Sequence, residues 1–343
     1  MQEGMNGMKE NVSEESKIGI GLVTPSAPAP ALFSNRFERG VKCLEHMGFN
    51  VKRGKYVSTK DGVTSASAIK RAEDINNMYA DEEVSLVMAT IGGDYSAEIL
   101  PYLDWEIIRA NRKGFIGYSD ITVLLHAIGI MSQQVVFYGP TLMTEMSEYP
   151  VPPQLSKESF LQILDEKTSY EVSPCDSLLA KGNDWALPPR ERNTFCPTFH
   201  KVIRQGQARG IVLGGCIEAL ERLRGTKFWP CFKNSIMVIE TVDDEFDEKK
   251  WRSFVTDYTN MGVFKELSGI VIGQKMWNEN SVNSLSTMLL EATSDTKIPI
   301  LYGLPFGHIS PIATIPLFTS AVLDADSMKL EYNKPFKYEY IKR

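Results

Sequence analysis

The stretch Val84–Leu103, VSLVMATIGGDYSAEILPYL, decides the fold class of this chain. Its first eight residues are apolar with few breaks, which predicts a buried strand, and the remainder reads as a turn followed by the amphipathic start of a helix. Two adjacent glycines, Gly92 and Gly93, let the backbone bend tightly and come close to a ligand. A buried strand that turns into a helix is the building unit of α/β proteins.

The turn carries one hydroxyl group, that of Ser96. The N–H groups that open the following helix point at whatever lies above this serine. A nucleophile and an oxyanion site can be built at one such turn. The alternative is that Ser96 only caps the helix. Asp94, in the same turn, is a further candidate for substrate binding.

Strands and helices alternate on both sides of this stretch. Further buried strands are predicted at 18–23, 114–118 and 135–138, and helices at 35–47, at 67–79 and directly after the pair Ser119-Asp120. We interpret Ser119 and Asp120 as an N-cap pair. The alternation predicts a parallel sheet flanked by helices, and such folds bind ligands at the carboxyl ends of their strands. Ser96 lies at such an end.

The length of the chain predicts two domains, because 343 residues exceed one typical domain. We divide it into a disordered lead (1–16), an N-terminal domain (17–140), a proline-rich linker with a substrate loop (141–205) and a C-terminal domain (206–343). In the C-terminal part a strand, a Gly-Gly turn and a helix are predicted after Gly206. Apolar strands are predicted there at 235–239, 269–273 and 298–302, with helices at 249–261 and 284–292.

Composition excludes several classes of function. A formal net charge of -6 without a basic block argues against nucleic-acid binding. The acidic run at 243–248 is interpreted as a solvated loop and helix start, because no histidine lies near it in the sequence. With 4 histidines in the whole chain, we expect no metal centre and no cofactor.

The cysteines and the lack of long apolar runs indicate the cellular compartment. The 5 cysteines show no C-x-x-C spacing, so we expect free thiols in a reducing compartment. The N-terminal residues lack the basic and apolar regions of a signal peptide, and no apolar run is long enough to span a bilayer. These observations predict a cytoplasmic protein without membrane or nucleic-acid partners.

Three side chains at turns or strand ends could cooperate in acyl transfer. Glu240 ends the apolar strand SIMVI, and His308 lies in the loop LPFGHISP, framed by prolines. An acid at a strand end could face solvent, yet such a carboxylate commonly points into a cleft. Serine catalysis needs a hydroxyl nucleophile, an imidazole base and a carboxylate that holds the imidazole. Ser96, His308 and Glu240 supply one of each.

The remaining histidines and one tryptophan allow weaker statements. His126 lies on an apolar helix and is interpreted as a packed core residue; His46 and His200 are poorer catalytic candidates than His308. Trp185, in a polar loop rich in proline, either anchors that loop or offers a flat stacking surface to a ring of the ligand.

Four motifs, IGGDYSAEILPYLD, KGFIGYSDITVLLHA, IMVIET and LPFGHISP, occur in this order along the chain. Their combination resembles the serine peptidase family that contains LD-carboxypeptidases and microcin C immunity proteins, over about residues 17 to 335. The resemblance implies a flavodoxin-like N-terminal domain, a smaller C-terminal α/β domain and a homodimer. By motif it implies Ser96 as nucleophile with Glu240 and His308, and an oxyanion hole at the backbone N–H groups of Gly93 and Ala97.

Two features favour the immunity branch of that family. LD-carboxypeptidases usually carry arginine two residues after the nucleophile, where this chain has Glu98. The segment 183–186, NDWA, resembles the loop with which immunity proteins stack the base of an aminoacyl-nucleotide, which gives Trp185 that role. The expected substrate is therefore a peptidyl- or aminoacyl-nucleotide. The alternatives are an LD-carboxypeptidase that acts on cell-wall muropeptides and, outside enzymes, a protein that only sequesters a ligand.

Overall fold

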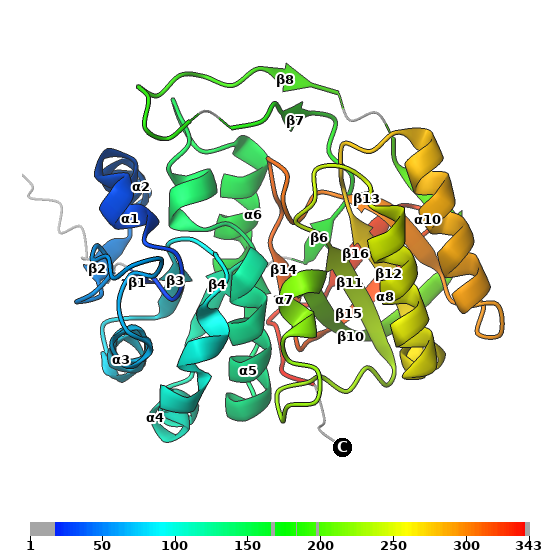
Figure 1. Ribbon diagram of the computed structural model, residues 1–343, viewed down its shortest axis with the longest axis horizontal. Coiled ribbons are helices and arrows are strands. Elements are labelled where there is room, and N and C mark those ends of the chain that lie inside the picture. The colour runs from blue at the N-terminus through cyan, green and yellow to red at the C-terminus, as the bar shows by residue number, and fades with distance from the viewer. Residues whose placement is uncertain (1–17, 166–168, 183, 197–198, 340–343) are drawn as a thin grey trace, which may run out of the picture.

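The computed structural model describes residues 18–165, 169–182, 184–196 and 199–339. The lead predicted to be disordered, at 1–16, lies outside these residues. Two sheets stand side by side with helices packed on them, and the chain fills the left half of Figure 1 before the right half. None of the helices in the described part of the chain has the length and apolar character needed to cross a bilayer.

The first sheet has six strands in the order β14-β5-β4-β3-β1-β2. They are β1 (Gly19–Val23), β2 (Asn50–Arg53), β3 (Leu86–Ala89), β4 (Gly114–Gly117), β5 (Val136–Tyr138) and β14 (Ile315–Leu317). All pairs are parallel except β14 with β5. The order 2-1-3-4-5 of the parallel strands is that of flavodoxin-like folds, so the predicted fold class is confirmed.

Helices cover both faces of this sheet. They are α1 (Ala29–Leu32), α2 (Ser34–His46), α3 (Ala68–Ala80), α4 (Trp105–Ala110), α5 (Thr122–Ser132) and α6 (Gln154–Leu164), with the short turns η1 (Ser96–Tyr102), η2 (Ser119–Ile121) and η3 (Leu142–Met146). The predicted apolar face of α2 is confirmed, because Phe37, Val41 and Leu44 are buried. Gly48, with φ +96°, lies just beyond its end, as helix termination requires.

The second sheet has eight strands in the order β6-β16-β15-β10-β11-β12-β13-β9. They are β6 (Tyr170–Val172), β9 (Lys201–Arg204), β10 (Gln207–Cys216), β11 (Ser235–Glu240), β12 (Leu267–Gly273), β13 (Ile300–Leu304), β15 (Ser320–Asp324) and β16 (Lys329–Tyr332). The central strands β10 to β13 are parallel, and antiparallel strands extend both edges. The edge strands β6 and β9 come from the segment predicted to be a linker.

Four helices and a small ribbon complete the second half. The helices are α7 (Ile217–Glu221), α8 (Glu248–Asn260), α9 (Val263–Glu266) and α10 (Glu279–Ala292); the ribbon pairs β7 (Leu178–Leu179) with β8 (Thr194–Phe195). This ribbon passes over the top of both halves in Figure 1. It carries the loop with Trp185 between its two strands.

The prediction of a Gly-Gly turn in the C-terminal domain is wrong. Gly214 and Gly215 are part of β10, which continues to Cys216 before α7 begins. Both have positive φ, and a Cβ on Gly214 would lie 1.9 Å from the carbonyl oxygen of Val238. The glycines are therefore needed for close strand packing at the end of β10 rather than for a turn.

The two halves share one hydrophobic core and one crossing strand. The buried apolar residues of both sheets belong to a single contiguous cluster. After β13 the chain returns to the first sheet, where β14 pairs with β5 through Ile315 and Tyr138. The loop between β13 and β14 therefore spans the boundary between the sheets, and this loop carries His308.

Candidate active site

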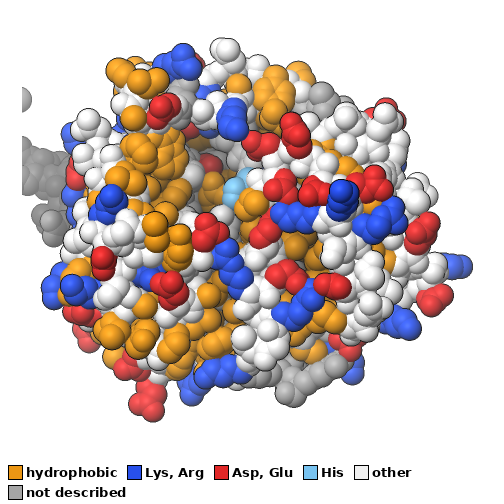
Figure 2. All heavy atoms as spheres, in the orientation of Figure 1, with side chains coloured by type: hydrophobic (Ala, Val, Ile, Leu, Met, Phe, Trp, Pro, Cys, Tyr) orange, Lys and Arg blue, Asp and Glu red, His pale blue; other side chains and the backbone are white. Residues whose placement is uncertain are grey.

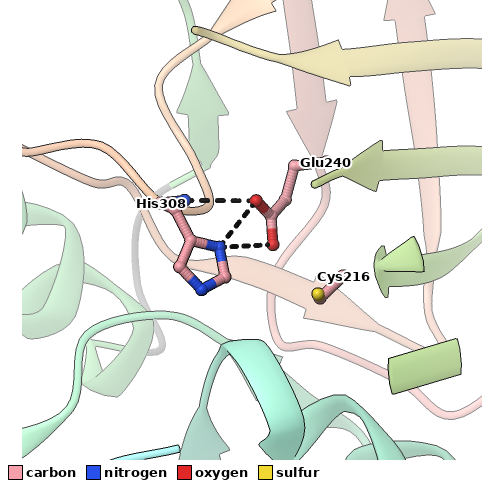
Figure 3. Close-up of side chains that lie close together, drawn as sticks. All are labelled: Cys216, Glu240 and His308. Atoms are coloured by element: carbon pink, nitrogen blue, oxygen red, sulfur yellow. Dashed lines mark hydrogen bonds and ion pairs between the residues drawn. The ribbon is translucent and has the colours of Figure 1, made fainter. Parts of the chain in front are cut away.

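Glu240 and His308 meet where the two sheets adjoin. Glu240 is the last residue of β11 and is fully buried. The Nδ1 atom of His308 lies 2.9 Å and 3.1 Å from the two carboxylate oxygens of Glu240, and the backbone N–H of His308 donates to the same carboxylate at 3.2 Å. Figure 3 shows the ring held edge-on to the acid. This geometry places the proton on Nδ1 and leaves Nε2 free to accept one.

The hydroxyl group at Nε2 of His308 belongs to Ser119. The Nε2–Oγ distance is 2.9 Å. Ser119 lies two residues after the end of β4, where the chain turns into η2 and α5, and its φ is +65°. Positive φ is uncommon for residues other than glycine. A strand that turns sharply into a helix through a strained serine is the arrangement that presents nucleophiles in many hydrolases.

The structure does not bring Ser96 to the histidine. Its side chain is fully buried, and its hydroxyl group donates to the backbone carbonyl of Asp120 at 2.8 Å. Its backbone N–H donates to the Asp120 carboxylate at 2.9 Å. The hydroxyl predicted to meet His308 is thus committed to the neighbouring turn, and Ser119, which we interpreted as an N-cap residue, occupies the expected position.

Several neighbouring groups determine the pKa of the Glu240 carboxyl group. Burial raises the pKa of its carboxyl group, but the contacts with His308, the hydroxyl group of Tyr138 and Lys275 outweigh burial, so the pKa lies below its ordinary value. The Tyr138 hydroxyl donates to Glu240 at 2.5 Å. Lys275 is buried and donates to the carbonyl of Thr241 at 3.0 Å. Glu240 is therefore held ionised, ready to stabilise an imidazolium ion.

Gly92 brings the two serine turns together. A Cβ on Gly92 would lie 3.0 Å from Cβ and 3.2 Å from Oγ of Ser119, and 3.4 Å from the backbone nitrogen of Asp120. Gly93 follows with φ +144°. Ala97 is the residue after Ser96 in η1, so its N–H belongs to the turn of Ser96 and not to that of Ser119.

A cavity of about 320 Å³ opens at His308 and reaches Trp185. The Trp185 ring is supported by the Arg36 guanidinium, 4.5 Å from its centroid, and by the Phe33 ring, which is perpendicular to it with a centroid separation of 5.5 Å. The loop that carries it is therefore anchored, and the same ring lines the cavity. Asn183, part of the motif that suggested base stacking, lies outside the described residues. Figure 2 shows hydrophobic, acidic and basic side chains bordering the hollow between the two halves.

Asp94, predicted to bind substrate, and Glu98, on which the choice of branch rests in part, both contact arginines. The Asp94 carboxylate pairs with Arg222 at 2.7 Å, and Asp94 is not among the described residues that line the cavity. Glu98 forms an ion pair with the buried Arg71. Glu98 lies in η1 with Ser96 and is not among the described residues that line the cavity.

Cys216 is the third side chain of Figure 3. Within the described part of the chain, ligand atoms of Cys216, Glu240 and His308 lie within 4.8 Å of one another, a set that could hold a metal ion. The carboxylate and the imidazole are already hydrogen bonded to each other, and the Cys216 thiol donates to Glu218 at 3.0 Å. These bonds account for the cluster, so we assign it no metal.

Of the other histidines, His126 fits its interpretation as a core residue. It is fully buried in α5, and its Nε2 lies 2.8 Å from the carbonyl oxygen of Gly214 in β10. Burial lowers its pKa to about 4.

A hydroxyl, an imidazole and a carboxylate in hydrogen-bonded series, at or beyond the carboxyl ends of β4, β11 and β13, are the kinds of group that serine hydrolases use. The LD-carboxypeptidase N-terminal domain model matches residues 20–139, and the LD-carboxypeptidase C-terminal domain model matches residues 209–323. The chain belongs to the LD-carboxypeptidase family, and it is a serine carboxypeptidase-type hydrolase.

Its relatives include proteins of both branches. The chain is 30% identical over 330 residues to the microcin C7 self-immunity protein MccF of Escherichia coli, covering 92% of this chain and 93% of that one. It is 24% identical to the murein tetrapeptide carboxypeptidase of Pseudomonas aeruginosa, over 90% of this chain and 95% of that one. These matches confirm the family resemblance read from the sequence motifs.

Solved structures of MccF share the fold along nearly the whole chain. The complex of MccF with aspartyl sulfamoyl adenosine superposes with a TM-score of 0.83 at 28% identity, covering 93% of this chain and 97% of that one. An MccF-like protein from Bacillus anthracis gives 0.84 at 26%, with 93% and 98% covered.

Proposed function

We propose that Ser119, His308 and Glu240 form the catalytic triad of this hydrolase. The observation that carries the proposal is the continuous series from the Ser119 hydroxyl through both ring nitrogens of His308 to the buried Glu240 carboxylate. Ser119 takes the role that the sequence assigned to Ser96, and the other two keep theirs. The chain order serine, acid, histidine is that of the α/β-hydrolases.

The reaction follows from this geometry. His308 Nε2 takes the proton of Ser119 as Oγ attacks the carbonyl carbon of the scissile amide, and the imidazolium ion formed is stabilised by Glu240. His308 then gives this proton to the leaving nitrogen, which leaves an acyl-enzyme that water hydrolyses by the same steps.

An oxyanion hole is available beside Ser119. The N–H of the residue after the nucleophile, here Asp120, commonly contributes one donor, and a neighbouring loop gives the second. We assign the second donor to Gly93, because the backbone at Gly92 lies against Ser119 and Asp120. Gly93 thus keeps its predicted role, and Asp120 takes the place predicted for Ala97.

The substrate we favour is a peptidyl- or aminoacyl-nucleotide. The cavity that holds His308 also exposes the Trp185 ring, which can stack on a nucleobase. MccF, a relative at 30% identity, has been crystallised with aminoacyl sulfamoyl nucleosides. Because the murein tetrapeptide carboxypeptidase of Pseudomonas aeruginosa is also a relative, assays should pair an aminoacyl sulfamoyl adenosine with a cell-wall tetrapeptide.

The triad is tested by covalent labelling. A fluorophosphonate transfers its phosphonyl group to an activated serine with loss of fluoride, and peptide mass spectrometry locates the modified residue. We expect stoichiometric modification of Ser119 and none of Ser96. Labelling of Ser96 would overturn the assignment, and absence of both labelling and turnover in folded protein would favour a protein that only sequesters its ligand.

The stacking role of Trp185 is tested by truncation of the ring. Trp185→Ala should weaken binding of aminoacyl sulfamoyl adenosine by about 1 to 3 kcal/mol, the range for bases stacked on aromatic side chains. Trp185→Phe should retain most of the affinity, because it keeps an aromatic face. Calorimetry on a Ser119→Ala background measures binding without turnover, and equal affinity of all variants would exclude stacking.

The homodimer that the family resemblance implies is still a prediction. Sedimentation of the pure protein would test it by measuring the mass of the particle in solution.

A further inference from the structure

The turn at Ser119 needs external support. Its positive φ places a residue with a Cβ in a sparsely populated conformation, which persists only where the surroundings hold it. Within the first half, the Ser96 hydroxyl and N–H hold Asp120, and the Thr122 hydroxyl donates to the Ser119 carbonyl at 2.7 Å. These contacts fix one side of the turn.

The other side is held by helix α7 of the second half. At its start, the backbone N–H of Cys216 donates to the Thr122 hydroxyl at 3.2 Å, and thus supports the group that holds Ser119. At its end, Arg222 donates to the buried Asp120 carboxylate at 2.6 Å. The same guanidinium donates to the backbone carbonyl and the carboxylate of Asp94, each at 2.7 Å.

Arg222 is thus shared by both serine turns. Asp94 belongs to the turn of Ser96, and Asp120 to that of Ser119. The planar guanidinium has donors in fixed directions, so it sets the spacing of the two acids in a way that a single ammonium group cannot. Both oxygens of Asp120 are engaged, one by Ser96 and one by Arg222.

We propose that Arg222 is a positioning residue. From the second half of the molecule it holds Asp120 and Asp94, and thereby fixes the position of the Ser119 hydroxyl group. This rests on the proposed role of Ser119. The second half then contributes to catalysis in two ways: it supplies the base and its acid, and through α7 it fixes the turn that the base must meet.

The test compares two arginines of the same segment. Arg222→Ala should lower kcat and the rate of fluorophosphonate labelling by about 10- to 100-fold, the loss that small displacements of reacting groups cause, with KM nearly unchanged. Arg222→Lys should show rates between those of Arg222→Ala and the wild type. The matched control is Arg224→Ala, because Arg224 pairs with Glu221 and Asp257 inside the second half. Arg224→Ala should leave both rates unchanged.

Thermal unfolding of each variant shows whether a lower rate comes from a displaced Ser119 or from a less stable fold. If Arg222→Ala does not fold, Asp94→Ala removes the exposed end of the clamp without stranding a buried charge, and should lower the labelling rate several-fold. The proposal is overturned if folded Arg222 and Asp94 variants label Ser119 as fast as Arg224→Ala. Failure of the wild type to label at Ser119 would instead overturn the proposed function.

Discussion

The molecule contains two turns that look alike in the sequence and differ in the structure. β3 and β4 are neighbouring parallel strands, and each runs through a serine into a 3₁₀ turn. In the first, Ser96 is fully buried and bonded to Asp120. In the second, Ser119 is partly exposed, has positive φ and touches His308. The absence of a side chain at Gly92 in the first turn leaves the space that the Ser119 side chain of the second turn occupies.

The sharpest way to break this comparison is to remove the hydroxyl at Ser119. Ser119→Ala should lower kcat by at least about 10⁴-fold, because loss of a triad serine leaves only the oxyanion hole and binding. Steady-state hydrolysis of aminoacyl sulfamoyl adenosine measures this, with circular dichroism as a control for folding. Near-normal turnover would show that the two turns have been assigned the wrong way round.

A second test uses pH, because the helix that follows Ser119 carries His126. Burial lowers the pKa of His126 to about 4 from 6.5. Below pH 6.5 the unfolded chain therefore binds the proton more readily, so this residue lowers the free energy of unfolding as pH falls towards 4, by up to about 3 kcal/mol. His126→Gln should flatten that slope in denaturant titrations from pH 7 to 4. A slope in His126→Gln equal to that of the wild type would contradict this.

A third test acts at the contact between the turns. Gly92→Ala places a Cβ 3.0 Å from Cβ of Ser119, closer than ordinary packing allows. The Ser119 hydroxyl must shift, and we expect kcat to fall about tenfold or more. Labelling rate and melting temperature should be measured together. A variant that melts earlier but labels at the wild-type rate would show that the turns are not mechanically linked.

The smallest effect is expected at Ser96. Ser96→Ala removes one hydrogen bond to the Asp120 carbonyl, worth about 1 kcal/mol, and leaves the backbone bond to the Asp120 carboxylate. We expect kcat to fall by about tenfold or less, with fluorophosphonate still attached to Ser119. Complete loss of turnover in a folded Ser96→Ala variant would return Ser96 to the role predicted from the sequence.

Most of the fold could be predicted from the pattern of apolar runs in the sequence. The parallel strands and the longer helices of the first half, the acid at the end of β11 and the histidine in its proline-framed loop could be predicted, because burial and turn residues leave clear traces. The short helix α1 in a proline-rich segment and the return of β14 to the first sheet could not. The serine that contacts His308 could not. A serine and an aspartate before a helix indicate an N-cap, and neither the positive φ of Ser119 nor its hydrogen bonds with the hydroxyl groups of Tyr138 and Thr122 can be read from the sequence. The hydrophobic run before GYSD was the available signal for a strand-to-helix nucleophile turn.

The path of the chain around His308 limits how a substrate can enter. The residues before this loop pair in the second sheet through β13, and those after it pair in the first through β14. Hinged separation of the halves would have to unzip β14 from β5 and expose a shared core, at a large cost in free energy. We therefore expect loading and product release to depend on the ribbon of β7 and β8 above the cavity, so that cross-linking this ribbon to α2 should slow exchange while the reaction centre stays assembled.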